Sequence, residues 1–340
     1  MRQRHRPIIP DLQSDPFAER AAPLRAKMQL LGCTVEFESN SRELLRLVRI
    51  AYAGLPRQSP TAGAPQLKIS LWLTAGKEAH RRSEPAPLQM GSGAGFLGGA
   101  TASSSFVVIS PTERAAMVVV SPTMLRFPYH TRYELIEFAV YTLVARVKQL
   151  VPLHAACVGR DGYGALLMGD SGSGKSTLSL LCLLAGFEFL SEDSTFVTPD
   201  TLLAAAVTNF LHVRADSLRW VTQTRETAAI RKSPVIRRRS GVRKFELDLR
   251  RQRYKLAARP QKIRALVFLR AAAGQPALRA LSRSETLNRL AAAQTYAAGQ
   301  PRWKEFCANL ARVDSFELRR GQHPSESVAA LQELLRPRTR

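Results

Sequence analysis

The stretch that decides the fold runs from Gly164 to Asp193 and reads GALLMGDSGSGKSTLSLLCLLAGFEFLSED. Within it, GDSGSGKS at 169–176 matches the P-loop or Walker A pattern G-x-x-x-x-G-K-[ST] at every fixed position. An apolar segment of strand length precedes the motif, and apolar residues at helical spacing, 175–186, follow it. Because strand, glycine-rich loop and helix come in the order that a P-loop requires, the sequence predicts a nucleotide-binding α/β domain.

The chemistry of phosphate binding explains why each of these residue types occurs in the motif. Gly172 and Gly174 let the backbone curl, so that N–H groups point into one concavity at the positive end of the following helix. The Lys175 ammonium would reach the β- and γ-phosphates, and the Ser176 hydroxyl would take a place on Mg²⁺. The predicted cofactors are therefore ATP and Mg²⁺. The predicted nucleotide-binding residues of the loop are Gly169, Asp170, Ser171, Gly172, Ser173, Gly174, Lys175, Ser176 and Thr177.

Two acidic residues, Glu192 and Asp193, end the predicted strand 187–193 that directly follows the P-loop helix. In a right-handed β-loop-α-β unit the next strand usually lies beside the first, which would bring both carboxylates close to the phosphates. The alternative is two solvated acids in a turn.

His154 opens the predicted strand 153–158, ahead of a second predicted strand at 164–169. A single histidine at a strand start is more often structural than catalytic. If these two strands pair, however, His154 can approach the acidic strand end and there orient or polarise a carboxylate base.

The segment HAACVGRDGYGALLMGDSGSGKST followed by FEFLSED resembles the HPr kinase/phosphorylase family and its diverged relatives. The shared pattern is a histidine opening a strand, a second strand into the P-loop, a helix, and a strand that ends in two acids. The resemblance implies a P-loop kinase core like that of HPr kinase and phosphoenolpyruvate carboxykinase. It also implies an ATP-dependent phosphotransferase that phosphorylates a serine hydroxyl.

Carried over to this chain, the resemblance implies that Ser176 and Asp193 share Mg²⁺. Glu192 takes the place of the family's proton acceptor, and His154 lies beside that base. The predicted catalytic residues are His154, Lys175, Glu192 and Asp193, and the predicted metal-side residues are Ser176 and Asp193.

Two departures from the family bear on the acceptor. The acidic pair is Glu-Asp here and Asp-Asp in the family, and the downstream glycine-rich segment used for the reverse reaction has no clear copy. HPr is therefore in doubt as the acceptor, and the expectation is a serine in another protein or in a peptide, such as a precursor peptide.

The segment 214–264 is densely basic, with 17 Lys and Arg against 4 Asp and Glu. Its simplest interpretation is a solvated arginine-rich face. The functional alternative is that some of these cations bind triphosphate or an acidic acceptor peptide. Arg243 and Lys244 are the strongest candidates, because they start an apparent strand, VRKFEL.

Charge and cysteine usage limit the class of protein. The formal net charge is +23, from 50 Lys and Arg and 27 Asp and Glu, but most of the cations are arginine and coding bias alone can produce this excess. Four cysteines without a C-x-x-C pattern predict neither a zinc site nor a disulfide framework and fit a cytoplasmic location. The sequence predicts no signal peptide and no membrane span.

The chain is expected to have a loose N-terminal arm (1–25), a smaller α+β domain (26–150) and the P-loop kinase-like domain (151–340). In the α+β domain the patterns predict strands at 34–39, 67–73, 106–110 and 115–121 and helices at 42–55 and 129–150. Residues 81–105, rich in Gly, Ser, Ala and Pro, read as a flexible loop.

Two other functions compete with the kinase hypothesis. The first is a P-loop NTPase acting on nucleic acid, but 214–264 holds only three aromatic residues for base stacking, so nucleic acid is not the favoured partner. The second is a non-catalytic nucleotide-sensing protein, which would bind ATP without transferring phosphate. The sequence leaves open whether the chain forms a homo-oligomer.

Overall fold

The computed structural model describes residues 24–75, 84–101, 105–251, 254–271, 277–321 and 323–336. These residues divide into two compact units. Unit 1 comprises 24–28, 35–51 and 66–143, and unit 2 comprises 29–34, 52–65 and 144–336, with the gaps given above. The predicted arm lies outside the described residues except for Leu24 and Arg25, which begin a strand.

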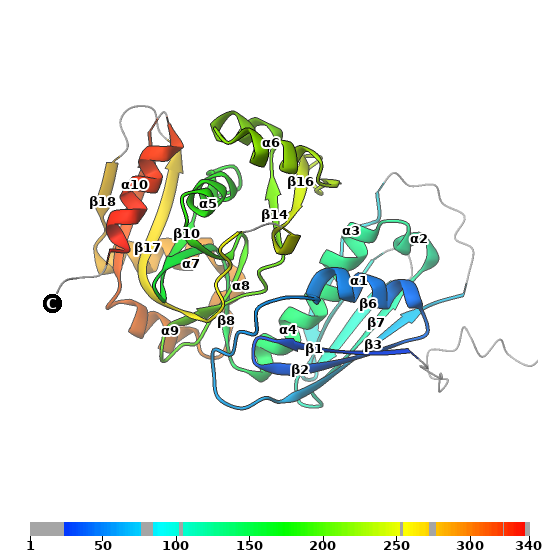
Figure 1. Cartoon of the computed structure of the whole chain (residues 1–340). Helices are drawn as coiled ribbons and strands as arrows, with labels where there is room; N and C mark the ends of the chain where they lie inside the picture. The colour runs from blue at the N-terminus through cyan, green and yellow to red at the C-terminus, as the bar shows by residue number, and fades with distance from the viewer. Residues whose placement is uncertain are drawn as a thin grey trace, which may run out of the picture. The chain divides into compact units, whose positions relative to one another are not determined.

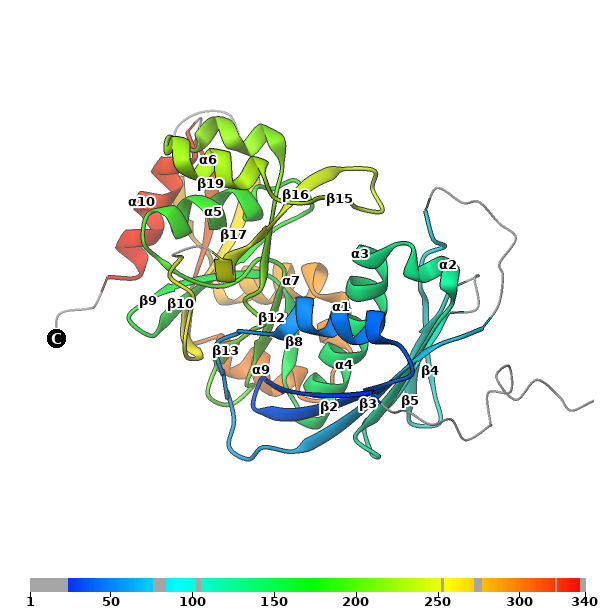
Figure 2. The same cartoon turned by 45° about the vertical axis from the view of Figure 1, so that its right-hand side comes forward.

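Unit 1 is built on a seven-stranded sheet with the order β1-β2-β3-β7-β6-β5-β4. Strands β2 and β3 alternate buried and more exposed residues, as strands with one covered face do. Figures 1 and 2 show α1 and α4 on one face of this sheet. The elements are β1 (Leu24–Leu30), β2 (Cys33–Ser39), α1 (Arg42–Tyr52), β3 (Gln66–Leu73), β4 (Gln89–Gly93), β5 (Phe96–Ala100), β6 (Phe106–Ser110), β7 (Ala115–Val120), α2 (Pro122–Leu125), α3 (Pro128–His130), a π-helix (Thr131–Ile136) and α4 (Glu137–Val147).

The prediction of a flexible loop over 81–105 is wrong for 89–100, because β4 and β5 form an antiparallel hairpin there, while 81–83 and 102–104 lie outside the described residues. The glycines of this segment interrupt the alternating hydrophobic pattern by which strands are predicted. A Cβ on Gly98 would lie 2.3 Å from the carbonyl oxygen of Val107 on the neighbouring strand, so a glycine is required there for the backbones to approach. The glycine content that suggested a loop thus includes one residue, Gly98, that the close approach of β5 to β6 requires.

Unit 2 contains a nine-stranded sheet with β17 at its centre. Strand β10 pairs in parallel with one edge of β17, and β13 and β19 share the other edge. A separate three-stranded sheet has the order β14-β16-β15. The strands are β8 (Val151–His154), β9 (Ala156–Arg160), β10 (Tyr163–Met168), β11 (Glu188–Ser191), β12 (Ser194–Val197), β13 (Leu203–Ala205), β14 (Phe210–Val213), β15 (Val235–Arg237), β16 (Arg243–Asp248), β17 (Gln261–Ala271), β18 (Ala277–Ala280) and β19 (Asp314–Arg320).

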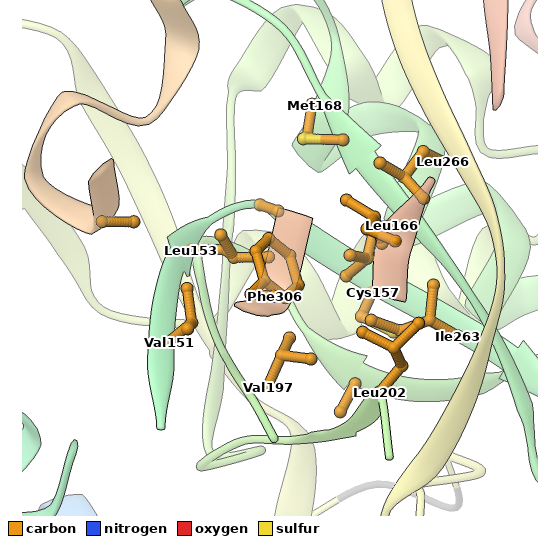
Figure 3. Close-up of a cluster of buried hydrophobic side chains, with 14 of the residues drawn as sticks. Val151, Leu153, Cys157, Leu166, Met168, Val197, Leu202, Ile263, Leu266 and Phe306 are labelled. Carbon is orange, nitrogen blue, oxygen red and sulfur yellow. The ribbon is translucent and has the colours of Figure 1, made fainter. Parts of the chain in front are cut away.

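Helices cover both faces of the nine-stranded sheet. Residues 165 and 167 of β10 pack against α5 and α10, while 166 and 168 pack against α7, α8 and α9 on the opposite face. Figure 3 shows Phe306 of α9 among side chains of β8, β9 and β10. The helices are α5 (Lys175–Leu184), a 3₁₀-helix (Ala215–Trp220), α6 (Thr224–Arg231), a 3₁₀-helix (Leu249–Arg251), α7 (Arg283–Ala293), α8 (Thr295–Ala298), α9 (Trp303–Leu310) and α10 (Pro324–Leu334).

Helix α5 lies between two hydrophobic clusters. Leu178 and Cys182 face the nine-stranded sheet, whereas Leu180 and Leu183 pack with β14, β16 and α6. A helix that is apolar on two sides is held in one orientation, which fixes the loop at its N-terminus. None of the helices in the described part of the chain is long and apolar enough to cross a membrane.

Candidate nucleotide-binding and phosphotransfer site

The P-loop joins β10 to α5, as the sequence predicts, and lines a cavity of about 800 Å³ in unit 2. Gly174 caps α5 with φ +96°, a left-handed conformation that favours glycine. A Cβ on Gly174 would also lie 2.2 Å from Nη1 of Arg320, at the end of β19. The Arg320 guanidinium therefore lies directly against the loop backbone.

Lys175 is buried at the start of α5. Its ammonium donates to the carbonyl oxygens of Gly169 and Asp170, the latter at 3.3 Å. Burial lowers the pKa of Lys175, and the nearby Asp193, Asp170 and Glu192 carboxylates oppose that shift. A phosphate in the loop would give this cation a stronger acceptor than two neutral carbonyl groups.

Glu192 is the acid that reaches the P-loop. The Ser176 hydroxyl donates to its Oε1 at 2.6 Å, and the Lys244 ammonium lies 3.7 Å from the same oxygen. The other oxygen, Oε2, accepts from the backbone N–H of His212 at 2.8 Å. Only 8% of Glu192 is exposed, so this carboxylate is fixed and largely dehydrated.

A buried chain of charges continues behind Glu192. The His212 ring lies between two carboxylates, with Nδ1 2.9 Å from Glu192 Oε2 and Nε2 3.2 Å from Glu246 Oε1. Burial alone would lower the pKa of His212, but the two glutamates outweigh it and raise this pKa to about 9. Burial likewise opposes ionisation of Glu192, yet His212 and Lys244 hold its pKa below the ordinary value. Both partners are therefore charged at neutral pH.

Asp193 and His154 form a second, more accessible pair. Asp193 Oδ1 lies 2.8 Å from His154 Nδ1, and the exposed side-chain fractions are 23% for Asp193 and 58% for His154. Arg238 approaches the other oxygen, Oδ2, at 3.5 Å. Two expected pairings are thus exchanged, since the structure places His154 beside Asp193 and not Glu192, and Ser176 beside Glu192 and not Asp193.

Strand order explains the exchange. Strand β11 pairs with β9, which lies between it and β10, so the acidic strand end is one strand further away than predicted. Strand β8 pairs instead with β12, in a register that sets His154 opposite Ser194. Asp193 precedes Ser194 directly, so this pairing carries the histidine to the second acid.

Of the two basic candidates, only Lys244 lines the cavity. Arg243 precedes it in β16, where successive side chains point to opposite faces, and it is not among the residues that line the cavity. The structure therefore does not bring Arg243 to the wall of this cavity. Arg238, one of the other cations of the basic stretch that were candidates to reach the site, lines the cavity as well.

Several residues that complete the site carry no sequence signal of their own. His212 and Glu246 face each other across the pairing of β14 with β16. Arg320 and Trp220 line the cavity from segments far along the chain. Only the three-dimensional pairing of these segments identifies them.

The donor groups fit a phosphate and a hard cation. Arg320 Nε is buried and has no hydrogen-bond partner within the described residues, beside a loop built of backbone donors. Ser176 and Glu192 present the hydroxyl and carboxylate oxygens that Mg²⁺ prefers, and Mg²⁺ usually takes its other ligands from phosphate and water. In the described part of the chain, no group of three or more His, Cys, Asp or Glu side chains could hold a metal on its own.

The comparisons with known proteins find matches among solved structures only. No protein-family model matches the chain, and no curated protein matches its sequence. Among solved structures, the HPr(Ser) kinase/phosphatase from Coxiella burnetii is 13% identical at a TM-score of 0.29. The match covers 54% of this chain and 96% of that one. These values indicate only a distant structural relation.

Proposed function

We propose that the protein is an ATP-dependent kinase that transfers the terminal phosphoryl group to a serine hydroxyl of a protein or peptide. The observation that supports this most is the 2.6 Å contact between the P-loop Ser176 and the buried Glu192, with Asp193 and His154 in the same cavity. A P-loop supplies phosphate binding, and phosphoryl transfer is mostly positioning and charge stabilisation. The additional acid–histidine pair is what a hydroxyl acceptor requires.

In this proposal Glu192 serves the metal side. It is buried, its pKa is lowered, and it accepts a hydrogen bond from the P-loop serine, so it is a poor proton acceptor. Ser176 and Glu192 would hold Mg²⁺, which when bound neutralises charge on the phosphate oxygens. Lys244, 3.7 Å from Glu192, adds a positive charge on the same side.

Asp193 is then the general base. It is the more exposed of the two acids, and the His154 ring fixes one of its oxygens at 2.8 Å. A carboxylate within hydrogen-bond reach of the acceptor can take its proton as the bond to phosphorus forms. This assignment exchanges the two acidic roles that the family resemblance implies.

The test uses the full chain, Mg²⁺ and ATP labelled on the terminal phosphate. Candidate acceptor proteins and peptides are added, and mass spectrometry locates any phosphoserine. Transfer that is lost in Lys175→Ala supports a kinase. A chain that binds ATP but transfers phosphate neither to an acceptor nor to water would be a nucleotide sensor, which would contradict the proposal.

A further inference from the structure

The P-loop helix separates the cavity into two ends. Ser176 and Thr177 are consecutive residues of α5, so their side chains point about 100° apart around the helix. Ser176 contacts Glu192, whereas the Thr177 hydroxyl lies 2.8 Å from the Ser217 hydroxyl in the 3₁₀-helix Ala215–Trp220. The acids therefore mark one end of the cavity, and the segment around Ser217 marks the other.

The position of the acids determines which way the phosphate donor lies in the cavity. Transfer requires its terminal phosphate beside Asp193 and His154, since those residues would activate the acceptor. The rest of the donor then extends past Thr177 toward Ser217. The residues that line the cavity include Arg219 and Trp220, which belong to the same 3₁₀-helix as Ser217.

Trp220 offers a flat aromatic surface at this end. The Arg219 guanidinium lies over the ring, with its Cζ 4.7 Å from the ring centroid, and the His323 ring makes a T-shaped contact with it, with the two centroids 4.8 Å apart. The described residues that line the cavity include two aromatic rings, those of His154 and Trp220, and the indole of Trp220 is the larger. A fixed, partly exposed indole binds a nucleobase by stacking, and stacking tolerates any base because every base has a π-face.

From this geometry we propose that Trp220 is the stacking surface for the base of the phosphate donor. The donor class is thus a nucleoside triphosphate and not an inorganic polyphosphate. This inference rests on the proposed kinase function, and it adds the residue that would recognise the base of the donor.

The test compares two ligands that share the triphosphate but differ in the base. Binding of ATP and of inorganic tripolyphosphate, each with Mg²⁺, is measured by calorimetry on the full chain, on Trp220→Ala and on Trp220→Phe. We expect Trp220→Ala to bind ATP about tenfold more weakly, near the lower end of what one stacked base contributes, and tripolyphosphate as before. Trp220→Phe keeps a ring and should recover most of the ATP affinity.

Fluorescence gives an independent measurement, since the chain has three tryptophans, Trp72, Trp220 and Trp303. ATP should change the emission of the wild type and of the control Trp72→Phe, but not that of Trp220→Phe.

Each contrary result has a distinct meaning. Equal losses for ATP and tripolyphosphate in Trp220→Ala would make Trp220 a structural part of the wall and overturn the stacking role. No loss for either ligand would also overturn it, while leaving P-loop binding intact. A wild-type chain that binds neither ligand would overturn both this inference and the proposed kinase function.

Discussion

Gln294 holds both backbone polar groups of His154. The His154 N–H donates to Gln294 Oε1 at 2.8 Å, and Gln294 Nε2 donates to the His154 carbonyl at 3.0 Å. Gln294 lies between α7 and α8. The Gln294 amide thus makes the two backbone hydrogen bonds that a neighbouring strand would make at the end of β8. It thereby fixes His154, whose ring faces Asp193.

Loss of this clamp should lower turnover more than nucleotide affinity. In Gln294→Ala, the partly buried backbone groups of His154 lose two partners, which costs less than the about 1–3 kcal/mol of a fully buried group left unpaired. We expect the rate of phosphoryl transfer to fall while the dissociation constant for ATP stays within a few-fold. Single-turnover kinetics and calorimetry measure the two quantities. An unchanged rate would show that His154 needs no such positioning.

Because the two acids exchange roles, replacing each by its amide should have a different effect on activity. Asp193→Asn should lose about 10²–10⁴-fold in kcat with ATP affinity retained, the usual contribution of a general base. Glu192→Gln should instead raise the Mg²⁺ concentration needed for half-maximal activity, because an amide is a poorer magnesium ligand. Mg²⁺ titrations of turnover for both variants decide the assignment. If Glu192→Gln behaved as predicted for Asp193→Asn, the roles implied by the family resemblance would be correct.

Lys175→Ala should abolish phosphoryl transfer and weaken the binding of ATP and tripolyphosphate together. It removes the ammonium at the start of α5, where charge develops on the transferred group. The exposed Lys262→Ala serves as a control that also removes one positive charge, but at a site outside the cavity. A Lys175→Ala protein that matched this control in binding and turnover would contradict the P-loop assignment.

The buried His212 predicts a fall in stability at alkaline pH. Its pKa is about 9 in the folded chain and about 6.5 when unfolded. A raised pKa stabilises the fold fully below the unfolded value, and that stabilisation is lost as the pH rises from about 6.5 through 9. Urea unfolding in the presence of a chelator should therefore show a decline of a few kcal/mol over this interval. In His212→Gln the decline should be absent, and its persistence there would assign it to another group.

The hairpin of unit 1 offers a matched pair of glycine substitutions. Gly98→Ala brings a Cβ to 2.3 Å from the Val107 carbonyl oxygen and should destabilise unit 1 by about 1–3 kcal/mol. Gly91→Ala, in the adjacent strand β4, meets nothing within 4 Å and should leave stability nearly unchanged. Thermal unfolding of both variants measures the difference. Equal effects would indicate that strand propensity dominates over the close approach.

The local part of the site was predictable from the sequence, and its long-range part was not. Strand β10, the P-loop and α5 are adjacent in the chain, and their order and hydrophobic pattern fix them. The partner of each acid depends on strand pairing, and β9 separates β11 from β10. His212, Gln294 and Arg320 reach the site through contacts between distant segments, for which the sequence carries no periodic signal. Lys244 was predictable from its strand, whereas the opposite orientation of Arg243 required knowledge of which face is buried.

The alternation along β10 also limits how the chain length can vary during evolution. Residues 165 and 167 face one hydrophobic cluster and 166 and 168 the other, and the strand runs directly into the P-loop. Inserting or deleting one residue would reverse both faces, and a change of two would move the loop by about 6.6 Å relative to Arg320 and Glu192. Insertions should therefore accumulate in surface turns such as 161–162 and be absent between β10 and α5. The number of residues between β10 and α5 is therefore expected to stay constant.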